Sequence, residues 1–453
     1  MNGFPRHVTA ALERGHDLIV VGGGIYGMML TLEAARRGLR PLLLEKDDFG
    51  GAASLNSLRI LHGGLRYLQS LDLPRFFESI EQRNWFMRLF APLCRGLPCI
   101  MPLYGRGLKR PSTFRVALVL NNRFARTDTL PGGRVLSREE TIGLFPAVPR
   151  DGLRGAGLWY DGQILSPQRL HAELLRWAAG CGASVLNYME ARELVREGGR
   201  VAGVATDAGV FRAPVVINAA GSWCREVATR FGSDQPGLMT PSLTFNVLLR
   251  VAPPSAAAVA VQGRRMYFVT PHQRGLTFVG TVHRAWEGLR EPTETMVAEF
   301  LSDLQAAIPD WRIRGEDVLR VTPGVLPSRG PGEADMAHRS VFHAHETPGL
   351  FSVCGIKYTT AQRFSVASIN RVFGPKNVAD LAPDTASRAS YIDPEVVMAL
   401  GDSELKAFCS EESVLHPEDL LERRVDWIVD EAARLQFQKR LQRMLPASPR
   451  GQT

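Results

Sequence analysis

Residues 17–46 contain the feature that most constrains this chain: two apolar runs separated by a glycine-rich turn and a helix-compatible segment. The first run is Leu18–Val21, and the second, Pro41–Leu44, ends at the acidic residue Glu45. Between the runs, the glycines have the Gly-x-Gly-x-x-Gly spacing: Gly22, Gly24 and Gly27. This order of strand, glycine turn, helix, strand and acid is the fingerprint of a dinucleotide-binding β-α-β unit. A glycine turn with only a structural role is the alternative.

Each glycine of this pattern has a physical role in such a unit. Gly22 permits the tight turn, Gly24 lets the backbone approach a pyrophosphate at the helix N-terminus, and Gly27 lets the helix pack closely on the strand. The acid at the end of the second strand is placed to accept hydrogen bonds from a ribose 2′-hydroxyl, which disfavours NADP and its 2′-phosphate. The residues expected to contact the dinucleotide in this unit are Gly22, Gly24, Ile25, Tyr26, Gly27, Glu45 and Lys46.

Length and composition indicate a soluble protein of several domains. A chain of 453 residues is too long for one core and predicts about two to three domains. The sequence has neither an apolar stretch long enough to span a membrane nor a signal-like N-terminus, so we expect a cytoplasmic location. The six cysteines form no CxxC pair and no metal-ligand spacing with histidines, which predicts reduced thiols and no metal site.

The chain is basic, with a formal net charge of +8 and an isoelectric point near 9.4. Its lysines and arginines are dispersed rather than gathered in long runs interleaved with aromatics, so we expect no nucleic-acid partner. An anionic substrate, an acidic partner, an anionic membrane surface and a general solubility surplus all remain open. A peripheral contact at the inner membrane face and a homodimer are kept as alternatives.

Segments far from the fingerprint predict further strands of the same domain. Val201–Asp207 and Val215–Trp223 predict a strand pair whose second member ends in small residues, as required where backbone passes close to a cofactor. Leu350–Lys357 predicts another buried strand, followed by a helix over Ala361–Val372. The stretches between them predict an antiparallel sheet: Leu243–Val251, Arg265–Thr270 and Leu276–Val282.

The remaining segments complete the predicted organisation. Leu71–Arg95 has a helical pattern, residues 105–135 predict a surface excursion, and the tail predicts helices over Glu404–Ser410 and Pro417–Leu445. The expected fold is α/β plus antiparallel β. It combines a discontinuous Rossmann-like nucleotide-binding domain with an inserted antiparallel-sheet substrate domain and a small C-terminal helical cap. The predicted boundaries are 1–72, 150–235 and 320–373 for the first domain, 73–149 and 236–319 for the second, and 374–453 for the helical appendage.

Four motifs in this order resemble the D-amino-acid-oxidase superfamily of FAD enzymes. The motifs are Leu43–Phe49, Leu61–Leu68, Asn218–Trp223 and Gly355–Thr360. Within that superfamily the chain is most similar to the flavin-linked glycerol-3-phosphate dehydrogenases, from about residue 16 to residue 372 and weakly again at Glu418–Arg424. The resemblance implies a tightly bound FAD and oxidation of a C–H next to a heteroatom, with hydride transfer to flavin N5. It also implies reoxidation of the reduced flavin by a quinone or oxygen.

The resemblance also implies roles for individual residues. Arg66 matches an arginine that faces the anionic group of the substrate, and Lys357 follows a strand-terminal glycine, where its charge suits the N1/O2 edge of a reduced flavin. The candidate proton acceptors are His62, His272 and His283. The further residues expected at the cofactor are Ser54, Arg59, Leu61, His62, Gly63, Gly64, Ala219, Gly221, Trp223, Gly355, Lys357, Tyr358 and Thr359. Those expected at the substrate are Arg66, Tyr67, His283, Leu326 and Arg339.

The sequence departs from the dehydrogenase pattern where that family binds phosphate. Leu326 stands in place of a phosphate-binding arginine, and the segment Thr240–Thr244 lacks two cations of the family motif. A charge-assisted contact to phosphate contributes about 1.5 to 3 kcal/mol, so its loss weakens binding by about tenfold to a hundredfold. Arg329, three residues after Leu326, follows at a different strand position. The pocket is therefore predicted to accept a larger or less charged substrate.

The leading functional prediction is FAD-dependent oxidation of an alcohol or amine carbon in a small polar molecule, by an enzyme that has diverged towards a biosynthetic or tailoring role. Glycerol-3-phosphate dehydrogenase activity with an altered phosphate clamp is the first alternative. A flavin-binding redox sensor or assembly partner without turnover is the second, and the presence of Arg66, Tyr67 and Lys357 argues against it.

Overall fold

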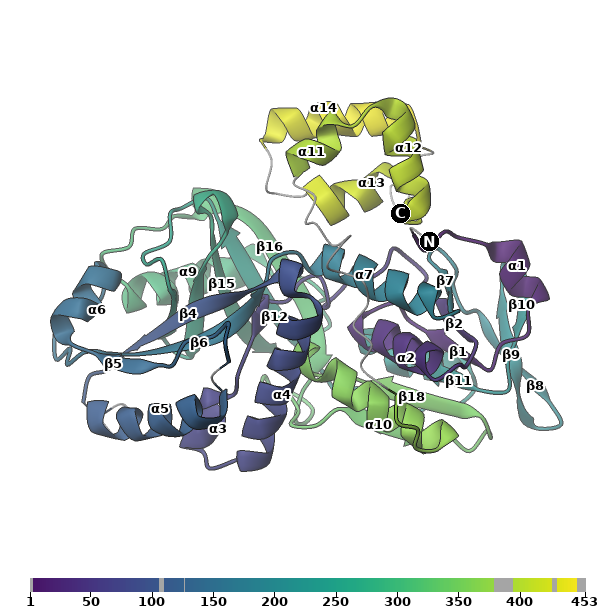
Figure 1. Cartoon of the computed structure of the whole chain (residues 1–453), viewed down its shortest axis with the longest axis horizontal. Coiled ribbons are helices and arrows are strands. Elements are labelled where there is room, and N and C mark those ends of the chain that lie inside the picture. The colour runs from purple at the N-terminus through teal and green to yellow at the C-terminus, as the bar shows by residue number, and fades with distance from the viewer. Residues whose placement is uncertain (1–2, 106–109, 126, 379–393, 426–429, 446–453) are drawn as a thin grey trace. The chain divides into compact units, whose positions relative to one another are not determined.

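The computed structural model describes residues 3–105, 110–125, 127–378, 394–425 and 430–445 (Figure 1). The chain forms two compact units, each assembled from separate stretches of sequence. Unit 1 comprises Met1–Leu55, Ser166–Ser242 and Val325–Thr453, and unit 2 comprises Asn56–Leu165 and Leu243–Gly324. Among the described residues, no helix combines the length and the hydropathy that crossing a membrane requires.

The glycine fingerprint lies at the centre of a six-stranded sheet in unit 1. β1 (Leu18–Val21) pairs in parallel with β2 (Pro41–Leu44) on one side and β11 (Val216–Asn218) on the other. Every residue of these three strands is buried, as expected for the middle of a parallel sheet covered on both faces. The strand order is β17-β18-β11-β1-β2-β7, and only β17 runs antiparallel to its neighbour. The outer strands are β7 (Ser184–Leu186), β18 (Leu350–Cys354) and β17 (Val341–Ala344).

Three helices pack together beside this sheet. α2 (Ile25–Arg36) follows the glycine turn and contacts both α7 (Pro167–Gly180) and α10 (Ala361–Phe373). α2 is buried from Ile25 to Ala35, because it packs on β1 and β2 as well as on the two helices. The hydroxyl of Ser166 accepts a hydrogen bond from the backbone N–H of Arg169 and caps α7. Two shorter helices of the unit are α1 (Val8–Glu13) and α8 (Cys224–Arg230).

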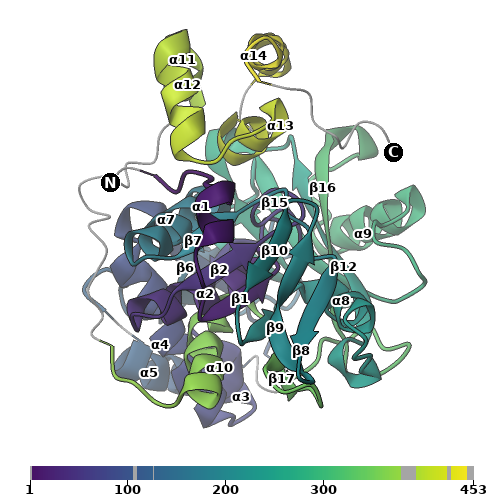
Figure 2. The ribbon, with the colours of Figure 1, turned by 90° about the vertical axis from the view of Figure 1, so that its right-hand side faces the viewer.

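A separate three-stranded antiparallel sheet in unit 1 corrects the predicted strand pair. β9 (Arg200–Thr206) pairs with β8 (Glu193–Glu197) and β10 (Gly209–Arg212), which Figure 2 shows side by side. β9 therefore does not pair with β11, although the two segments are close in sequence. The intervening β10 forms a hairpin with β9, so the chain reaches β11 only after that hairpin.

Unit 2 is built on a nine-stranded sheet that is mainly antiparallel. Its order is β16-β12-β15-β14-β13-β4-β6-β3, and β5 pairs with β6 off this path. β13 and β4 are paired in parallel. The strands are β3 (Ile60–Leu61), β4 (Cys94–Pro102), β5 (Arg134–Leu136), β6 (Ala156–Ile164), β12 (Pro241–Leu249), β13 (Ala258–Gln262), β14 (Met266–Pro271), β15 (Thr277–Ala285) and β16 (Val318–Pro327). The three predicted β-prone stretches are thus strands β12, β14 and β15.

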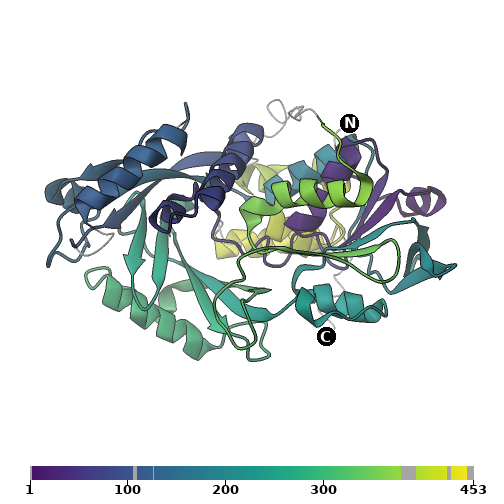
Figure 3. The same cartoon turned by 90° about the horizontal axis from the view of Figure 1, so that it is seen from below.

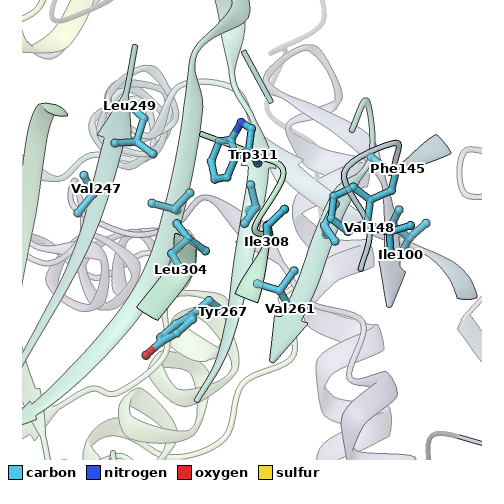
Figure 4. Close-up of a cluster of buried hydrophobic side chains, with 14 of the residues drawn as sticks. Ile100, Phe145, Val148, Val247, Leu249, Val261, Tyr267, Leu304, Ile308 and Trp311 are labelled. Atoms are coloured by element: carbon cyan, nitrogen blue, oxygen red, sulfur yellow. The ribbon is translucent and has the colours of Figure 1, made fainter. Parts of the chain in front are cut away.

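Apolar side chains of the sheet and of α9 (Glu294–Ala307) form the main core of unit 2. Val247, Val261 and Tyr267 from the strands meet Leu304 and the residues after the helix (Figure 4). A second cluster lies under α3 (Leu65–Gln69), α4 (Leu73–Leu89) and α5 (Pro111–Ala125). α6 (Arg138–Leu144) begins with a capping box.

Of two predictions for this part of the chain, one is confirmed with a different end and one is wrong. The predicted helix over Leu71–Arg95 ends at Leu89, because β4 begins at Cys94 and pairs with β6 along its whole length. The predicted excursion over 105–135 contains the fifteen-residue helix α5. Pro111 at its first position favours this helix start. Residues 106–109 and 126 of that segment lie outside the described residues.

The C-terminal segment forms a helical cluster with its own small core of Leu405, Leu420 and Leu441. Its helices are α11 (Pro394–Ala399), α12 (Asp402–Glu411), α13 (Pro417–Leu420), a short π-helix (Leu421–Val425) and α14 (Glu431–Gln442). These residues belong to unit 1, and residues 56–72 belong to unit 2. The unit boundaries therefore differ from the predicted ones. Much of the predicted link after Gly374, residues 379–393, lies outside the described residues.

Candidate functional site

Unit 1 contains a cavity whose lining residues follow the carboxyl ends of β1, β2, β11 and β18. In an open parallel sheet this is where ligands bind. Most residues that the sequence assigns to the cofactor line it: Gly22, Gly24, Ile25, Tyr26, Glu45, Lys46, Ser54, Ala219, Gly221, Trp223, Gly355, Lys357 and Tyr358. Residues as far apart in sequence as Gly22 and Tyr358 are thus brought to one cavity.

The geometry of the glycine turn explains two of its three glycines without any ligand. Gly22 has a φ of 106°, and a Cβ there would lie 2.7 Å from the carbonyl oxygen of Ala219. A Cβ on Gly27 would lie 1.8 Å from the carbonyl oxygen of Gly22, so α2 starts against the turn. Gly24 differs, because a Cβ would meet only the hydroxyl of Ser54, at 3.3 Å. The space beside Gly24 therefore remains open to the cavity, as a pyrophosphate requires.

Glu45 is held in place by backbone N–H groups that follow β1 and β2. Its two carboxylate oxygens accept hydrogen bonds from the N–H groups of Gly23, at 2.6 Å, and Asp47, at 2.9 Å. Burial raises the pKa of Glu45, and the two backbone hydrogen bonds oppose that rise. Each carboxylate oxygen has a further lone pair, so the group can still accept a ribose hydroxyl. Lys46 beside it lies over the ring of Trp223, 4.4 Å from the centroid.

Lys357 lies where β18 leads into a helical turn, and the side chain of Tyr26 holds the backbone of this junction in place. The phenol of Tyr26 donates to the carbonyl of Lys357 at 2.9 Å and lies 3.1 Å from the hydroxyl of Thr360 and 3.2 Å from that of Ser340. A Cβ on Gly355 would lie 2.0 Å from the Tyr26 ring, so only glycine fits above it. Burial raises the pKa of Tyr26, which keeps the phenol protonated and able to donate. Its contribution to the site is thus to position the backbone of the junction.

A buried histidine that no sequence pattern indicates supports the neighbouring Tyr358. The hydroxyl of Tyr358 lies 3.0 Å from Nε2 of His171, and the two rings stack with centroids 5.9 Å apart. Burial lowers the pKa of His171 to about 3, so its ring is neutral. Its Nδ1 packs under the loop after β2, where a Cβ on Gly50 would approach it to 2.3 Å. His171 therefore supports two walls of the cavity at once.

The residues present fit FAD. The cavity offers an acid at the ribose position, open backbone beside a helix N-terminus, and small residues at the end of β11. Lys357 and the N–H groups at the start of η7 (Tyr358–Thr360) would face an electron-rich edge of the flavin. Thr359 belongs to the same turn, although it does not line the cavity.

Of the residues predicted to contact the substrate, Leu326 lies at the cavity and Arg339 does not. Leu326 is on its wall, with its carbonyl accepting a hydrogen bond from Ser242 at 3.0 Å. Arg329 is exposed beyond the end of β16 and does not line the cavity. Arg339 is likewise exposed and outside the lining. The wall at this point is therefore apolar.

Unit 2 holds a histidine–aspartate pair that includes one predicted residue, His62. Its Nδ1 lies 3.0 Å from Asp161, which also accepts hydrogen bonds from the N–H of Gly63 at 2.8 Å and from the indole of Trp159 at 3.3 Å. Burial opposes ionisation of Asp161, but the interaction with His62, the hydrogen bond from Gly63 and the charge of Arg83 hold the pKa of Asp161 below its usual value. The pairing leaves Nε2 of His62 as the nitrogen able to take a proton, and half of the side chain is exposed.

Sequence reasoning missed Asp161 because the pair joins β6 to the end of β3, 99 residues apart. The only local feature that distinguishes Asp161 is the glycine after it, and an Asp-Gly dipeptide is typical of a turn. The glycines next to His62 have packing reasons of their own. A Cβ on Gly63 would lie 2.4 Å from the guanidinium of Arg83, and Gly64, with a φ of 83°, lies against Ser79.

The other predicted residues of unit 2 occupy different places. Arg59 is buried, 2.9 Å from Nε2 of His272 and over the ring of Phe278. Burial and this arginine lower the pKa of His272 to about 3, which makes it a weak base. Leu61 is buried in β3, and Arg66 is exposed on α3, over the ring of Tyr67.

His283, the third candidate base, is partly buried on β15. Roles for it, for Arg66 and for Tyr67 remain predictions.

The family model for FAD dependent oxidoreductases matches residues 17–363 of the chain. Glycerol-3-phosphate dehydrogenase of Synechocystis sp. is 28% identical over 404 residues, covering 83% of this chain and 72% of that protein. Glycerol-3-phosphate dehydrogenase 1 of Mycobacterium tuberculosis is 30% identical over 390 residues, with 80% and 74% covered. The mitochondrial enzyme of Arabidopsis thaliana is 31% identical over 381 residues, which cover 78% of this chain and 60% of the plant protein.

Solved structures show the same fold. Glycerol-3-phosphate dehydrogenase from Bacillus halodurans complexed with FAD superposes with a TM-score of 0.68 and 18% identity, covering 96% of this chain and 95% of that chain. Glycine oxidase from Geobacillus kaustophilus gives a TM-score of 0.61 and 20% identity, with 81% and 97% covered. The chain thus has the mixed α/β fold that both of these proteins share.

Proposed function

Because the chain belongs to the family of FAD-dependent oxidoreductases and uses FAD as its cofactor, we propose that it oxidises the C–H next to an alcohol or amine in a small polar substrate. FAD supplies a hydride acceptor at flavin N5 when it is bound. The protein contributes orientation of the substrate and stabilisation of the negative charge that the flavin gains.

The observation that carries the proposal is the position of Lys357. It lies on the cavity wall at the point where β18 leads into a helical turn. This strand-to-helix junction brings a cationic residue and the start of a helical turn to the cavity, and Tyr26 holds it through the Lys357 carbonyl. A flavin carrier without turnover has no need for a positioned cation at that point, so this arrangement supports an enzyme over a redox sensor.

We assign proton removal from the substrate to His62. Asp161 orients its imidazole and would stabilise the imidazolium that forms when Nε2 accepts the proton. His272 is a poorer candidate because Arg59 and burial disfavour its charged form. Arg66 is proposed to bind an anionic or polar group of the substrate.

The leucine on the cavity wall supports a substrate other than glycerol 3-phosphate. At the position of Leu326 a phosphate would meet an apolar side chain, and Arg329 is exposed elsewhere. Glycerol-3-phosphate dehydrogenase activity is the second candidate, because the three sequence relatives described above carry that name at 28 to 31% identity. We propose a quinone or oxygen as the electron acceptor and a cytoplasmic location for the enzyme.

Anaerobic bleaching of the bound flavin tests these proposals. The purified holoprotein is mixed with a panel of polyols, hydroxy acids and amines and with glycerol 3-phosphate, and the flavin absorbance is followed. We expect complete reduction by one class of the panel and slow or partial reduction by glycerol 3-phosphate.

Leu326→Arg should improve reduction by glycerol 3-phosphate by about tenfold. Leu326→Met is the matched control, because it changes shape without adding a cation. Fast reduction of the native protein by glycerol 3-phosphate would establish the second candidate, and no reduction by any compound would favour the flavin carrier.

A further inference from the structure

Asn218 lies at the carboxyl end of β11, directly before the small residues Ala219–Gly221 of the cavity wall. Its side chain is fully buried, so the amide must find its hydrogen-bond partners within the protein. Oδ1 accepts from the backbone N–H of Ala220 at 3.2 Å, and Nδ2 donates to the carbonyl of Cys224 at 2.7 Å. One side chain thus joins both ends of the turn that leads from β11 to α8.

These contacts allow the amide of Asn218 only one orientation. Nδ2 also donates to the hydroxyl of Ser352 on β18, at 3.2 Å, so both of its protons are used. In the reverse orientation the amide oxygen would face the carbonyl oxygen of Cys224, and the NH₂ group would face the N–H of Ala220. Each reversed contact is repulsive, so the orientation follows from the partners.

The orientation is supported further by a histidine after β17. Because the oxygen of Ser352 accepts from Asn218, its own proton is available to Nε2 of His345, which lies 2.8 Å away. Burial lowers the pKa of His345 to about 4, so its ring is neutral at pH 7 and can accept this proton. A hydrogen-bonded chain therefore crosses from the loop after β17 through β18 to the turn after β11.

The turn after β11 packs directly against the glycine turn that follows β1. The N–H of Ala219 donates to the carbonyl of Val21 at 2.8 Å. A Cβ on Gly22 would lie 2.7 Å from the carbonyl oxygen of Ala219 and 2.8 Å from Cα of Ala220. On its other side, the turn continues into α8, which packs against β11 and β18 (Figure 3). Because backbone is packed this closely, a shift of one turn displaces the other.

We propose that Asn218 is a positioning residue for FAD and that Ser352 and His345 set its orientation. None of the three is among the described residues that line the cavity, so they act through the turn rather than by contact with FAD. The alternative is a contribution to stability alone, which would leave the affinity of the folded protein for FAD unchanged. The proposal concerns the cofactor and does not depend on which substrate is oxidised.

The test measures two quantities in each full-length variant. They are the dissociation constant of FAD, from titration of the apoprotein, and the free energy of unfolding of the apoprotein. We expect Asn218→Leu, which keeps the size of the side chain without its hydrogen bonds, to weaken FAD binding about a hundredfold. Ser352→Ala should weaken it about tenfold and His345→Leu about threefold. His345→Gln, which keeps an acceptor for the Ser352 hydroxyl, should bind FAD like the native protein.

A double variant and a matched control separate positioning from stability. Asn218→Leu with Ser352→Ala should bind FAD no worse than Asn218→Leu alone, because Ser352 acts through the amide. Val216→Ala, at the other end of β11, removes buried methyl groups and should lower the free energy of unfolding while FAD binding is unchanged.

The proposal would be overturned by native FAD affinity in both Ser352→Ala and His345→Leu, two variants that decide the question even if Asn218→Leu does not fold. Additive losses in the double variant would also overturn it. So would a loss of FAD affinity in Val216→Ala as large as that in Ser352→Ala, because the effect would then follow stability rather than the orientation of the amide.

Discussion

At the scale of single residues, the His62–Asp161 pair is the arrangement whose chemistry is easiest to isolate. Asp161→Asn keeps the size of the side chain and an acceptor for the N–H of Gly63, but it removes the charge that stabilises an imidazolium. We expect the rate of flavin reduction to fall by roughly a hundredfold or more, with FAD still bound. Stopped-flow reduction under anaerobic conditions measures this rate. His7→Gln, at an exposed position with no assigned role, serves as the control, and an unchanged rate in Asp161→Asn would remove the pair from the mechanism.

His171 makes stability depend on pH, with a sign that follows from its burial. Its pKa is about 3 in the folded protein and about 6.5 when unfolded, so between these values the unfolded chain binds more protons. Stability therefore falls as the pH drops below about 6.5, by up to about 1.4 kcal/mol per pH unit from this residue alone. Chemical denaturation of His171→Gln should show a shallower acid slope. Exposed His7 is the control, because His7→Gln should leave the slope unchanged.

Local patterns predicted the residues whose role is set by neighbours in sequence, and missed those set by distant partners. Gly22 and Gly27 were predictable because the turn and helix that require them follow directly. Asp161 and His171 were not, because their partners His62 and Tyr358 lie 99 and 187 residues away. Burial and pairing of this kind depend on the folded sheet, which a pattern along the chain does not contain.

At the scale of elements, the C-terminal helices fasten the loop that follows β2. Buried Arg423 donates from Nε to Asp48 at 2.8 Å and also contacts that carboxylate with a second nitrogen, and Asp48 lines the cavity. Removing one partner of a buried pair costs about 3 to 5 kcal/mol. Arg423→Met should therefore loosen this loop and weaken FAD binding by about tenfold or more, measured by titrating the apoprotein with FAD.

Arg440→Met is the matched control for that prediction. Arg440 binds Asp402 and the carbonyls of Met398 and Leu400, all within the C-terminal helices. Its loss should loosen the helical cluster without releasing Asp48. Equal weakening of FAD binding by both variants would assign the effect to the cluster as a whole rather than to the ion pair.

The type of element could be predicted from the sequence where the apolar pattern was uninterrupted. The prediction failed where contacts with other parts of the fold determine the structure. β1, β2 and α2 have the predicted positions because strand, turn and helix signals agree there. The segment over 105–135 was assigned to a surface excursion because glycine and proline flank it, yet its centre forms α5. Because α5 also carries apolar residues on its outer face, its sequence lacks the contrast between an apolar and a polar face by which an amphipathic helix is identified.

At the scale of the whole molecule, FAD should stabilise the two units unequally, because the described residues that line its cavity all belong to unit 1. A ligand present at a hundred times its dissociation constant stabilises the state that binds it by about 2.7 kcal/mol. Adding FAD to the apoprotein should therefore slow amide exchange most in β1, β11 and β18, and least in β14 and β15 of unit 2. Hydrogen exchange followed by mass spectrometry measures the protection of both units in one sample.

Riboflavin, which lacks the pyrophosphate and adenosine, is the control for this prediction and should protect little. Equal protection of both sheets by FAD would show that the units unfold as one, and protection by riboflavin as strong as by FAD would remove the glycine turn from the binding site.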